Sequence, residues 1–444
     1  MGISEGKGEL MERESMEFDV VIVGAGPAGL ASMKTLVDAD LEFDCFERTQ
    51  AVGGHWNTDY EALHLITSSK VTGYEGHPMP EDWPIFPSRK LMLQYFEDFA
   101  DEFDLRKYVT FGVSVDRVEP LPTDGPTGSA GWNVTTSDGK TNTYDGVFVA
   151  NGHLWDEKRP EFPGEFTGKT IHSGSYTNTK DIDGTRVLVI GSGNSGCDVA
   201  VDAAQNLLET DIVIRRGHFF QPKTFFGVPR AELGWMQEFT FEEQDLIARL
   251  MIRLSVGTHE NYPGMPAPDH RTLADGPPVV NQLLLYWIHH GRISVKPGIE
   301  RFEGKTVHFS DGTSKEYDTI LYATGFHASL PFLSEEYIER QEGVPLRVGA
   351  AIVPIGLEKF YLIGMIGARG PQPPIYLIQA KIALEMVRLH EQAGGYRSIA
   401  GPLEKLQEKE WRIDILRPIW LDQVEHTKTA LSIMAEVQKE SISS

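Results

Sequence analysis

Two glycine-rich segments have the spacing with which a polypeptide backbone binds a diphosphate. In each segment the first glycine allows a tight turn, the second lets the backbone approach the pyrophosphate, and the third lets a helix pack closely against a strand. The N-terminus of that helix also attracts phosphates. The predicted phosphate-binding residues are Gly24, Gly26, Pro27, Ala28 and Gly29 in the first segment, and Gly191, Gly193, Asn194, Ser195 and Gly196 in the second.

A charged residue follows each glycine segment at nearly the same distance, but the two charges are opposite. Glu47 lies 18 residues after Gly29, and Arg215 lies 19 residues after Gly196. A carboxylate accepts hydrogen bonds from ribose hydroxyls and repels a 2′-phosphate, whereas a guanidinium group pairs with that phosphate. The sequence therefore predicts an FAD site in the first half and an NADPH site, to which Arg216 also contributes, in the second. The alternative for the two arginines is a solvated pair at a strand edge.

Strands and helices in register with the glycines must position both sites. Residues 18–23 are a β-branched run typical of a buried strand, residues 30–38 are predicted to form a helix, and residues 43–46 a second strand. The second repeat has a strand at 186–190, a helix ending near residue 208 and a strand at 211–214. This repeated unit predicts an α/β fold with two Rossmann-type dinucleotide-binding domains.

We expect the NADPH domain to be inserted into the FAD domain, because the chain should return to the first lobe from residue 325 onward. The FAD domain is predicted to comprise residues 17–163 and 325–444, the latter ending in helices, and the NADPH domain residues 164–324. Residues 1–16 are expected to be a flexible tail, 160–168 a linker, and 217–278 a loop-rich insertion that covers the cleft. Further helices are expected at residues 88–103, 279–289 and 402–439.

The residues that follow Glu47 suggest a second contact with the same cofactor. Gly53 and Gly54 permit a close backbone approach to the flavin diphosphate and the isoalloxazine ring. Trp56 either stacks on the cofactor or belongs to the core. The expected cofactor-binding residues of this segment are Glu47, Arg48, Gly54, His55 and Trp56.

Composition limits the remaining possibilities. The chain has 444 residues and a formal net charge of −23, so it lacks the basic surface that nucleic acids and anionic membranes attract. No apolar run approaches 18 residues, so no membrane span is predicted. Cys45 and Cys197 are far apart and form neither a dithiol motif nor a metal-ligand pattern. We therefore expect no metal, and a reduced, cytoplasmic location.

Several further motifs resemble those of the flavin-containing monooxygenases. Phe166, Gly168, His172 and Tyr176 have the spacing of the identifying motif of that family. Residues 322–326 (Tyr-Ala-Thr-Gly-Phe) resemble the segment that links the two lobes in the family, and residues 191–198 resemble its second glycine loop. The resemblance covers residues 18 to about 390.

The resemblance implies a class B flavoprotein monooxygenase with FAD and NADPH as cofactors, a small organic substrate and O2, and a homodimer. NADPH reduces FAD, oxygen adds to give a C4a-hydroperoxide, and this species transfers one oxygen atom to a nitrogen or sulfur of the substrate. A protein of this kind must keep water away from the reactive flavin and supply hydrogen bonds to it. The additional cofactor contacts that we expect are Val115, His172, Ser173, Tyr176, Ala323, Thr324, Gly325 and Gln372, with Gln379 as a further candidate. For His172 and Tyr176 a hinge role is favoured over catalysis.

One segment departs from the family pattern. Many members carry an asparagine beside the reactive flavin edge, in a segment that corresponds to residues 65–70 here, and its position falls on Thr67. A threonine hydroxyl can still donate one hydrogen bond, but with a different reach. We therefore take Thr67 or Ser68 as the candidate catalytic contact with the isoalloxazine or NADP⁺; the alternative is an ordinary turn residue.

Other functions remain open at this point. A Baeyer–Villiger oxygenase of ketones would use the same cofactors, although a tryptophan at the position of Tyr176 would resemble that class more closely. An uncoupled NADPH oxidase would result if Thr67 supports the oxygenated flavin poorly. A disulfide reductase is disfavoured because it needs neighbouring cysteines. A structural FAD-binding protein is disfavoured because the second site suits a diffusible nucleotide.

Overall fold

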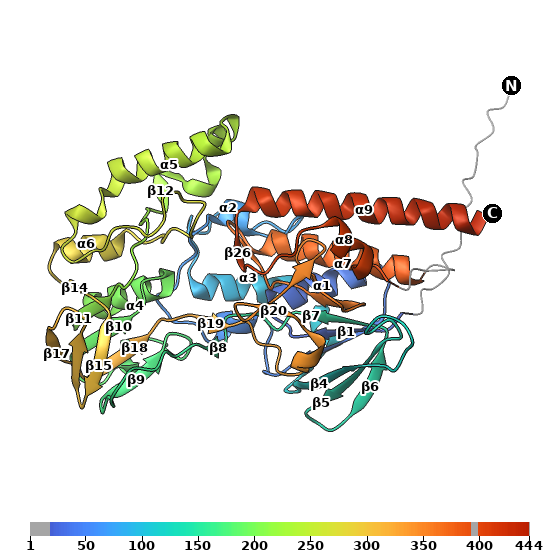
Figure 1. The fold of residues 1–444 in the computed structure, drawn as a ribbon, viewed down its shortest axis with the longest axis horizontal. Helices are drawn as coiled ribbons and strands as arrows, with labels where there is room; N and C mark the ends of the chain where they lie inside the picture. The colour runs from blue at the N-terminus through green and yellow to red at the C-terminus, as the bar shows by residue number, and fades with distance from the viewer. Residues whose placement is uncertain (1–17, 392–397, 444) are drawn as a thin grey trace.

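The computed structural model describes residues 18–391 and 398–443, so the predicted tail at residues 1–16 lies outside the described part. Two five-stranded parallel sheets organise two lobes (Figure 1). In the first lobe the strand order is β24-β7-β1-β2-β3, and every neighbouring pair is parallel. Its strands are β1 (Val20–Val23), β2 (Phe43–Glu47), β3 (Val109–Phe111), β7 (Gly146–Val149) and β24 (Phe360–Leu362).

The sheet of the second lobe has the order β14-β11-β10-β18-β9 and is also entirely parallel. Its strands are β9 (Lys169–His172), β10 (Arg186–Ile190), β11 (Glu209–Val213), β14 (Ile293–Lys296) and β18 (Thr319–Tyr322). Strands buried on both faces must be apolar throughout, and β1, β7 and β18 are buried at every position. The predicted α/β fold with two Rossmann-type domains is confirmed.

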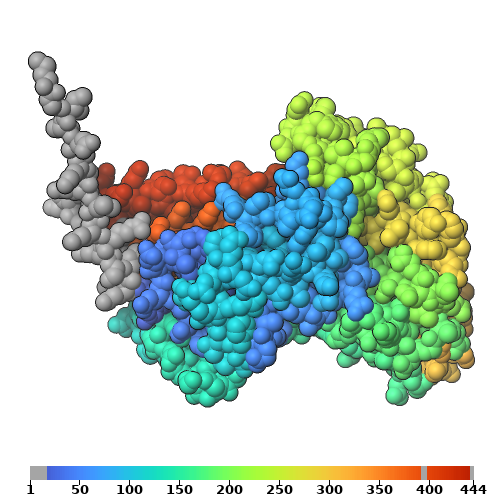
Figure 2. Space-filling view, turned by 180° about the vertical axis from the view of Figure 1, so that it is seen from behind, coloured from blue at the N-terminus to red at the C-terminus, as the bar shows by residue number. Residues whose placement is uncertain are grey.

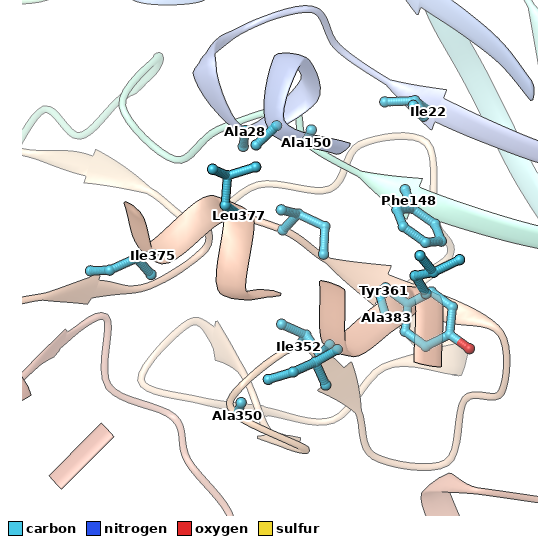
Figure 3. Packing of buried hydrophobic residues seen from close by; sticks show 14 of the residues in the cluster. Ile22, Ala28, Phe148, Ala150, Ala350, Ile352, Tyr361, Ile375, Leu377 and Ala383 are labelled. Atoms are coloured by element: carbon cyan, nitrogen blue, oxygen red, sulfur yellow. The ribbon is translucent and has the colours of Figure 1, made fainter. Parts of the chain in front are cut away.

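The helices of the first lobe cover its sheet and form its core. They are α1 (Pro27–Val37), α2 (Ser69–Thr72), α3 (Arg89–Glu102), α7 (Pro373–Glu391), α8 (Ala400–Leu406) and α9 (Arg417–Ser443). The helix expected at residues 88–103 is capped by Ser88, whose Oγ accepts a hydrogen bond from Leu91 N. In Figure 3, Leu377 on α7 points toward Ala28 and Ala150, so apolar side chains join α7 to the α1 end of the sheet.

Short strands complete the two lobes. The first lobe carries an antiparallel sheet of β4 (Val115–Pro120), β5 (Trp132–Thr136) and β6 (Thr141–Tyr144), and the second one of β15 (Ile299–Glu303), β16 (Thr306–Phe309) and β17 (Ser314–Glu316). The remaining two-residue strands after the second lobe are β20 (Arg340–Gln341), β21 (Val344–Pro345), β22 (Arg347–Val348), β23 (Val353–Pro354), β25 (Gly367–Ala368) and β26 (Asp414–Ile415).

The chain passes between the lobes twice, and the two passages lie side by side. β8 (Asp156–Glu157) pairs antiparallel with β19 (Phe326–His327). Lys158 N donates to Gly325 O at 3.0 Å, and Thr324 Oγ1 donates to Lys158 O. Beyond this ribbon, Phe162 and Phe166 of the predicted linker pack against Phe302 in the core of the second lobe. The chain therefore passes between the lobes at β8, before residues 160–168, which the sequence predicts as the linker.

The segment predicted to be loop-rich contains a 16-residue helix, α5 (Phe241–Val256), and in this respect the prediction was wrong. Thr240 and Glu243 cap it reciprocally. The signal for this helix is present in the sequence, because Leu246, Leu250 and Leu254 recur every four residues, although the fold leaves all three exposed. The rest of residues 217–278 holds β12 (Thr224–Phe225), β13 (Val228–Pro229) and three short 3-10 helices, η4 (Arg230–Glu232), η5 (Gly234–Glu238) and η6 (His259–Asn261).

Two other predicted helices differ in extent. The second lobe has α4 (Asn194–Gln205) as expected, but the helix expected over residues 279–289 is only α6 (Leu283–His289). The C-terminal helix expected over residues 402–439 is divided into α8 and α9, with β26 between them. Among the described residues, no helix combines the length and the apolar character that crossing a bilayer requires.

Gly196, near the start of α4, should be essential for stability, because the helix contacts the preceding turn at this residue. A Cβ added to Gly196 would lie 2.1 Å from Gly191 O, whereas one added to Gly193 meets nothing within 4 Å. We expect Gly196→Ala to lower the free energy of unfolding by about 1–3 kcal/mol, because backbone must move to admit the methyl group. Gly193→Ala is the matched control and should change it by less than about 1 kcal/mol. Thermal denaturation of both variants measures the difference, and equal melting temperatures would contradict this packing.

Candidate functional site

A hollow of about 440 Å³ opens at the carboxyl end of the first sheet. Ligands of open parallel sheets bind at this end. The predicted cofactor residues that line it are Gly24, Gly26, Pro27, Ala28, Glu47, Arg48, Gly54, His55 and Val115. The structure thus brings together residues from the glycine loop, from the end of β2 and from the start of β4.

The glycines of this hollow are required by the backbone around them. Gly24 has φ +102°, and a Cβ there would lie 2.8 Å from Ala150 O. A Cβ on Gly29 would lie 1.9 Å from Gly24 O, so the helix contacts the turn directly. Gly26 faces Gly54, whose Cα would be 3.5 Å from a Cβ on Gly26. Two glycine segments far apart in sequence therefore form one cradle without side chains, which suits a diphosphate.

Glu47 is held at the edge of that cradle. Its carboxylate is buried and accepts hydrogen bonds from Ala25 N at 2.8 Å and from Thr49 N at 2.9 Å. These hydrogen bonds fix the position of the predicted carboxylate at the end of β2, one strand away from the glycine loop.

The residues that line the hollow include several that the sequence analysis did not single out. Asn151 and His153 follow β7, and Gly364 and Tyr376 lie after β24. Both strands are neighbours in the sheet that contains β1, so their carboxyl ends meet the glycine loop. Local sequence patterns could not identify these residues as part of one site. Only the strand order brings them together, because they lie more than 200 positions apart in the sequence.

His153 is one titratable group in this set whose pKa the environment changes strongly. Its Nδ1 lies 3.2 Å from the carbonyl oxygen of Gly364, so Nδ1 carries the proton and donates it. Removal from water lowers the pKa of His153 to about 4. The ring is therefore neutral at neutral pH and presents Nε2 as an acceptor.

The second glycine loop has the same geometry as the first. Gly191 has φ +110°, and a Cβ there would lie 2.3 Å from the carbonyl oxygen of Ala323. Arg215 and Arg216 follow β11 with exposed side chains, at the carboxyl end where a 2′-phosphate would bind. Asn194 Oδ1 accepts from Val280 N at 2.8 Å. Asn194 is the first residue of α4 and Ser195 is the second.

Several predicted cofactor residues have packing or hydrogen-bonding roles instead of lining the hollow. Tyr176 donates to Asp202 Oδ2 at 2.6 Å and is fully buried, and His172 Nδ1 accepts from Gly174 N at 3.1 Å. Ser173 donates its amide to Tyr322 O at 2.7 Å. These bonds lie beside the β8–β19 ribbon, which favours the hinge interpretation over direct catalysis.

Three residues of the first lobe also pack or form hydrogen bonds within the fold instead of lining the hollow. Trp56 is partly buried and packs against the core, with its ring 6.0 Å from that of Phe96. Gln379 is buried and accepts from Gly364 N at 2.9 Å. Gln372 precedes α7 and donates to the carbonyls of Ala368 and Gly370. Neither glutamine lines the hollow.

Thr67 and Ser68 are buried at the start of α2 and do not line the hollow. Thr72 Oγ1 donates to Ser68 O at 2.6 Å, so in its 2.8 Å contact with Thr67 it must accept. The Thr67 proton is therefore already used within the turn. The Ser68 hydroxyl, by contrast, has no hydrogen-bond partner in the described part of the chain.

The two lobes are held together by a half-buried carboxylate on α4. Asp198 on α4 accepts from Tyr60 of the first lobe at 3.0 Å and from Asn281 at 2.7 Å. Tyr60 packs within the core of the second lobe. Burial raises the pKa of Asp198 to about 6. Lys223 of the insertion donates to Leu65 O at 2.8 Å.

Metal and thiol chemistry have no visible site. Among residues 18–391 and 398–443 no group of three or more histidine, cysteine, aspartate or glutamate side chains could hold a metal ion. Cys45 and Cys197 are buried free thiols, and burial raises the pKa of both. Neither is therefore a reactive thiolate at neutral pH.

Comparison with known proteins agrees with this geometry. The family model described as flavin-binding monooxygenase-like matches residues 18–419. The chain is 31% identical over 400 residues to dimethylaniline monooxygenase (N-oxide-forming) 2 of Oryctolagus cuniculus, covering 84% of this chain and 74% of that protein. It is 32% identical over 397 residues to flavin-containing monooxygenase 2 of Homo sapiens, covering 82% and 72%.

Solved structures show the same fold at lower identity. A flavin-containing monooxygenase from Stenotrophomonas maltophilia superposes with a TM-score of 0.65 at 20% identity, covering 84% of this chain and 98% of that one. An open structure of cyclohexanone monooxygenase gives a TM-score of 0.70 at 19% identity, covering 96% and 98%.

His153 should make the stability of the cofactor-free protein depend on pH. Its pKa is lower in the folded than in the unfolded state, so between about pH 6.5 and pH 4 only the unfolded chain binds the proton, and stability falls as the pH falls. Between pH 7 and pH 5 this protonation should lower the free energy of unfolding by about 2 kcal/mol, and His153→Gln should abolish that decrease. Denaturant unfolding at the two pH values measures this difference. An unchanged pH dependence in the variant would contradict the buried neutral ring.

Proposed function

We propose, from the premise that this chain belongs to the flavin-binding monooxygenase-like family, that it oxygenates a nitrogen or sulfur atom of a small organic molecule. The protein is a flavin monooxygenase that depends on FAD, NADPH and O2. The glycine loops followed by Glu47 in one lobe and by Arg215 in the other support the two cofactors. The observation that favours N- or S-oxygenation over Baeyer–Villiger chemistry is Tyr176, where a tryptophan would resemble the Baeyer–Villiger class more closely.

The residues of the first lobe fit FAD. The cradle formed by Gly24, Gly26 and Gly54 leaves room for the diphosphate, and added Cβ atoms would meet backbone there. Glu47 would accept hydrogen bonds from the ribose, and Val115 would lie near the adenine side of the hollow. When bound, FAD supplies the redox and oxygen-transfer chemistry, while the chain binds it, orients it and excludes water.

The residues of the second lobe fit NADPH. The loop from Gly191 to Gly196 would hold its pyrophosphate, and the exposed guanidinium groups of Arg215 and Arg216 would pair with its 2′-phosphate. The hydrogen bonds of His172, Tyr176 and Thr324 beside the two interlobe passages would set the relative position of the lobes.

Ser68 is the residue that we propose to donate a hydrogen bond to the oxygen-reactive edge of the cofactor. Its hydroxyl is buried and unpartnered, whereas the Thr67 proton is directed to Thr72. A buried hydroxyl without a partner costs free energy, so a bound group that satisfies it would be stabilised. This assigns to Ser68 the role that an asparagine has in many family members.

Two further expectations, on the cellular location and on the oligomeric state, belong to this proposal. The buried free thiols suit a reducing, cytoplasmic compartment. We also keep the homodimer that the family resemblance suggests.

Product analysis tests the proposed activity. The purified holoenzyme should consume NADPH in the presence of a tertiary amine or a thioether and form about one N-oxide or S-oxide per NADPH oxidised. A panel of thioanisole, N,N-dimethylaniline, indole and cyclohexanone, with hydrogen peroxide measured in parallel, separates the alternatives. A lactone from cyclohexanone as the main product would support Baeyer–Villiger chemistry instead. Peroxide equal to NADPH with every compound would show an uncoupled oxidase.

Removal of the Ser68 hydroxyl should uncouple oxygen transfer from NADPH oxidation. One hydrogen bond contributes about 1 kcal/mol, so Ser68→Ala should raise the peroxide formed per product by up to about fivefold. Thr67→Val is the matched control, because its hydroxyl serves the turn, and it should leave the coupling near that of the wild type. If Thr67→Val uncouples the enzyme and Ser68→Ala does not, the assignment is reversed.

A further inference from the structure

Arg230 carries a positive charge that no described residue of the chain neutralises. It starts η4, directly after the β12–β13 hairpin of the insertion. Its side chain is half-buried and its Nε is shielded from solvent without a hydrogen-bond partner. Burial lowers the pKa of Arg230 to about 10, so the group stays charged at neutral pH. A shielded charge without a counter-ion is unfavourable unless something else supplies one.

The position of Arg230 connects it to the candidate active site. Glu232, two residues later, forms an ion pair with Lys70 at 3.5 Å. Arg230 N donates to Lys223 O, and Lys223 Nζ donates to Leu65 O. The hairpin therefore lies on residues 65–70, which contain Ser68 with its unpartnered hydroxyl. Figure 2 shows the light-blue part of the first lobe, around residues 60–90, against the yellow-green insertion.

The charges at this contact do not balance. Glu232 accounts for the charge of Lys70. Burial lowers the pKa of Lys223, and the nearby carboxylate of Asp198 partly opposes that effect. In the described part of the chain no carboxylate pairs with Arg230, although the chain as a whole has a net charge of −23. An unpaired, partly shielded guanidinium group in so acidic a protein favours an anion that comes from solution.

We propose that Arg230 is the counter-ion for an anionic group of a small molecule bound between the insertion and residues 65–70. The inference rests on the proposed function, which brings two such molecules between the lobes: the oxygenated substrate, as a carboxylate, and the nicotinamide nucleotide, through a phosphate. Guanidinium groups bind carboxylate and phosphate in the same bidentate manner. If the substrate supplies the anion, the substrate class is a thioether or an amine that carries a carboxylate.

Thermal shifts of the holoenzyme distinguish a ligand site from a structural arginine. Arg230→Met removes the charge at similar length, Arg230→Lys keeps the charge, and Arg271→Met removes an exposed arginine of the same insertion as the control. Without ligand, the melting temperature of Arg230→Met should equal or exceed that of the wild type, because an unpaired shielded charge is replaced by an apolar side chain. A structural arginine would give the opposite result, a lower melting temperature with ligand-induced shifts unchanged, and this would overturn the proposal.

The ligands used are 4-(methylthio)benzoate, 3-(methylthio)propanoate and NADP⁺, with thioanisole as the uncharged comparison. Loss of the carboxylate-induced shift in Arg230→Met, with the shift kept in Arg230→Lys and Arg271→Met, assigns the site to the substrate. Loss of the NADP⁺-induced shift alone assigns it to the nucleotide. Unchanged shifts in Arg230→Met, or no shift of the wild type with any of the three anions, overturn the proposal. Sulfoxide formation from thioanisole is scored separately, so failure of the oxygenation and failure of the anion site are distinguishable.

Discussion

The close contact between a helix and the turn that precedes it determines the rest of this structure. In both lobes the third glycine of the loop lies so near the first that a Cβ would be about 2 Å from a carbonyl oxygen, at Gly29 and at Gly196. That contact directs the N-terminal amides of α1 and α4 toward the carboxyl ends of the parallel strands. The diphosphate cradle, and the place of the charged residue after the next strand, follow from it.

The second level of organisation is the contact between the lobes. The paired passages β8 and β19 connect them, and Tyr60 reaches from the first lobe into the core of the second to meet Asp198. The insertion then covers residues 65–70 through Lys223 and Glu232. The turn that holds Ser68 is therefore fixed by both lobes, so the chemistry proposed for it depends on the position of the nucleotide-binding lobe.

Much of this could be predicted from the sequence, because short-range signals determine it. The strands before the loops, the glycines with positive φ, the cap at Ser88 and the charges of Glu47 and Arg215 are all local patterns. The helix α5 was missed although its cap and its leucines at every fourth position are local signals. His153 and Tyr376 were missed because only the strand order brings them to the glycine loop. Tyr176 and Gln379 match a cofactor-site pattern, yet their partners, Asp202 and Gly364, give them roles within the fold.

The central claim is that two copies of one architecture select different nucleotides by the charge after the second strand. The ratio of kcat/KM for NADPH to kcat/KM for NADH, in the wild type and in an Arg215→Ser, Arg216→Ser double variant, tests it most directly. The account predicts a preference of at least about 100-fold for NADPH in the wild type, since two charge-assisted contacts contribute about 3 kcal/mol, and its near loss in the variant. Equal use of both nucleotides by the wild type, or an unchanged preference in the variant, would contradict it.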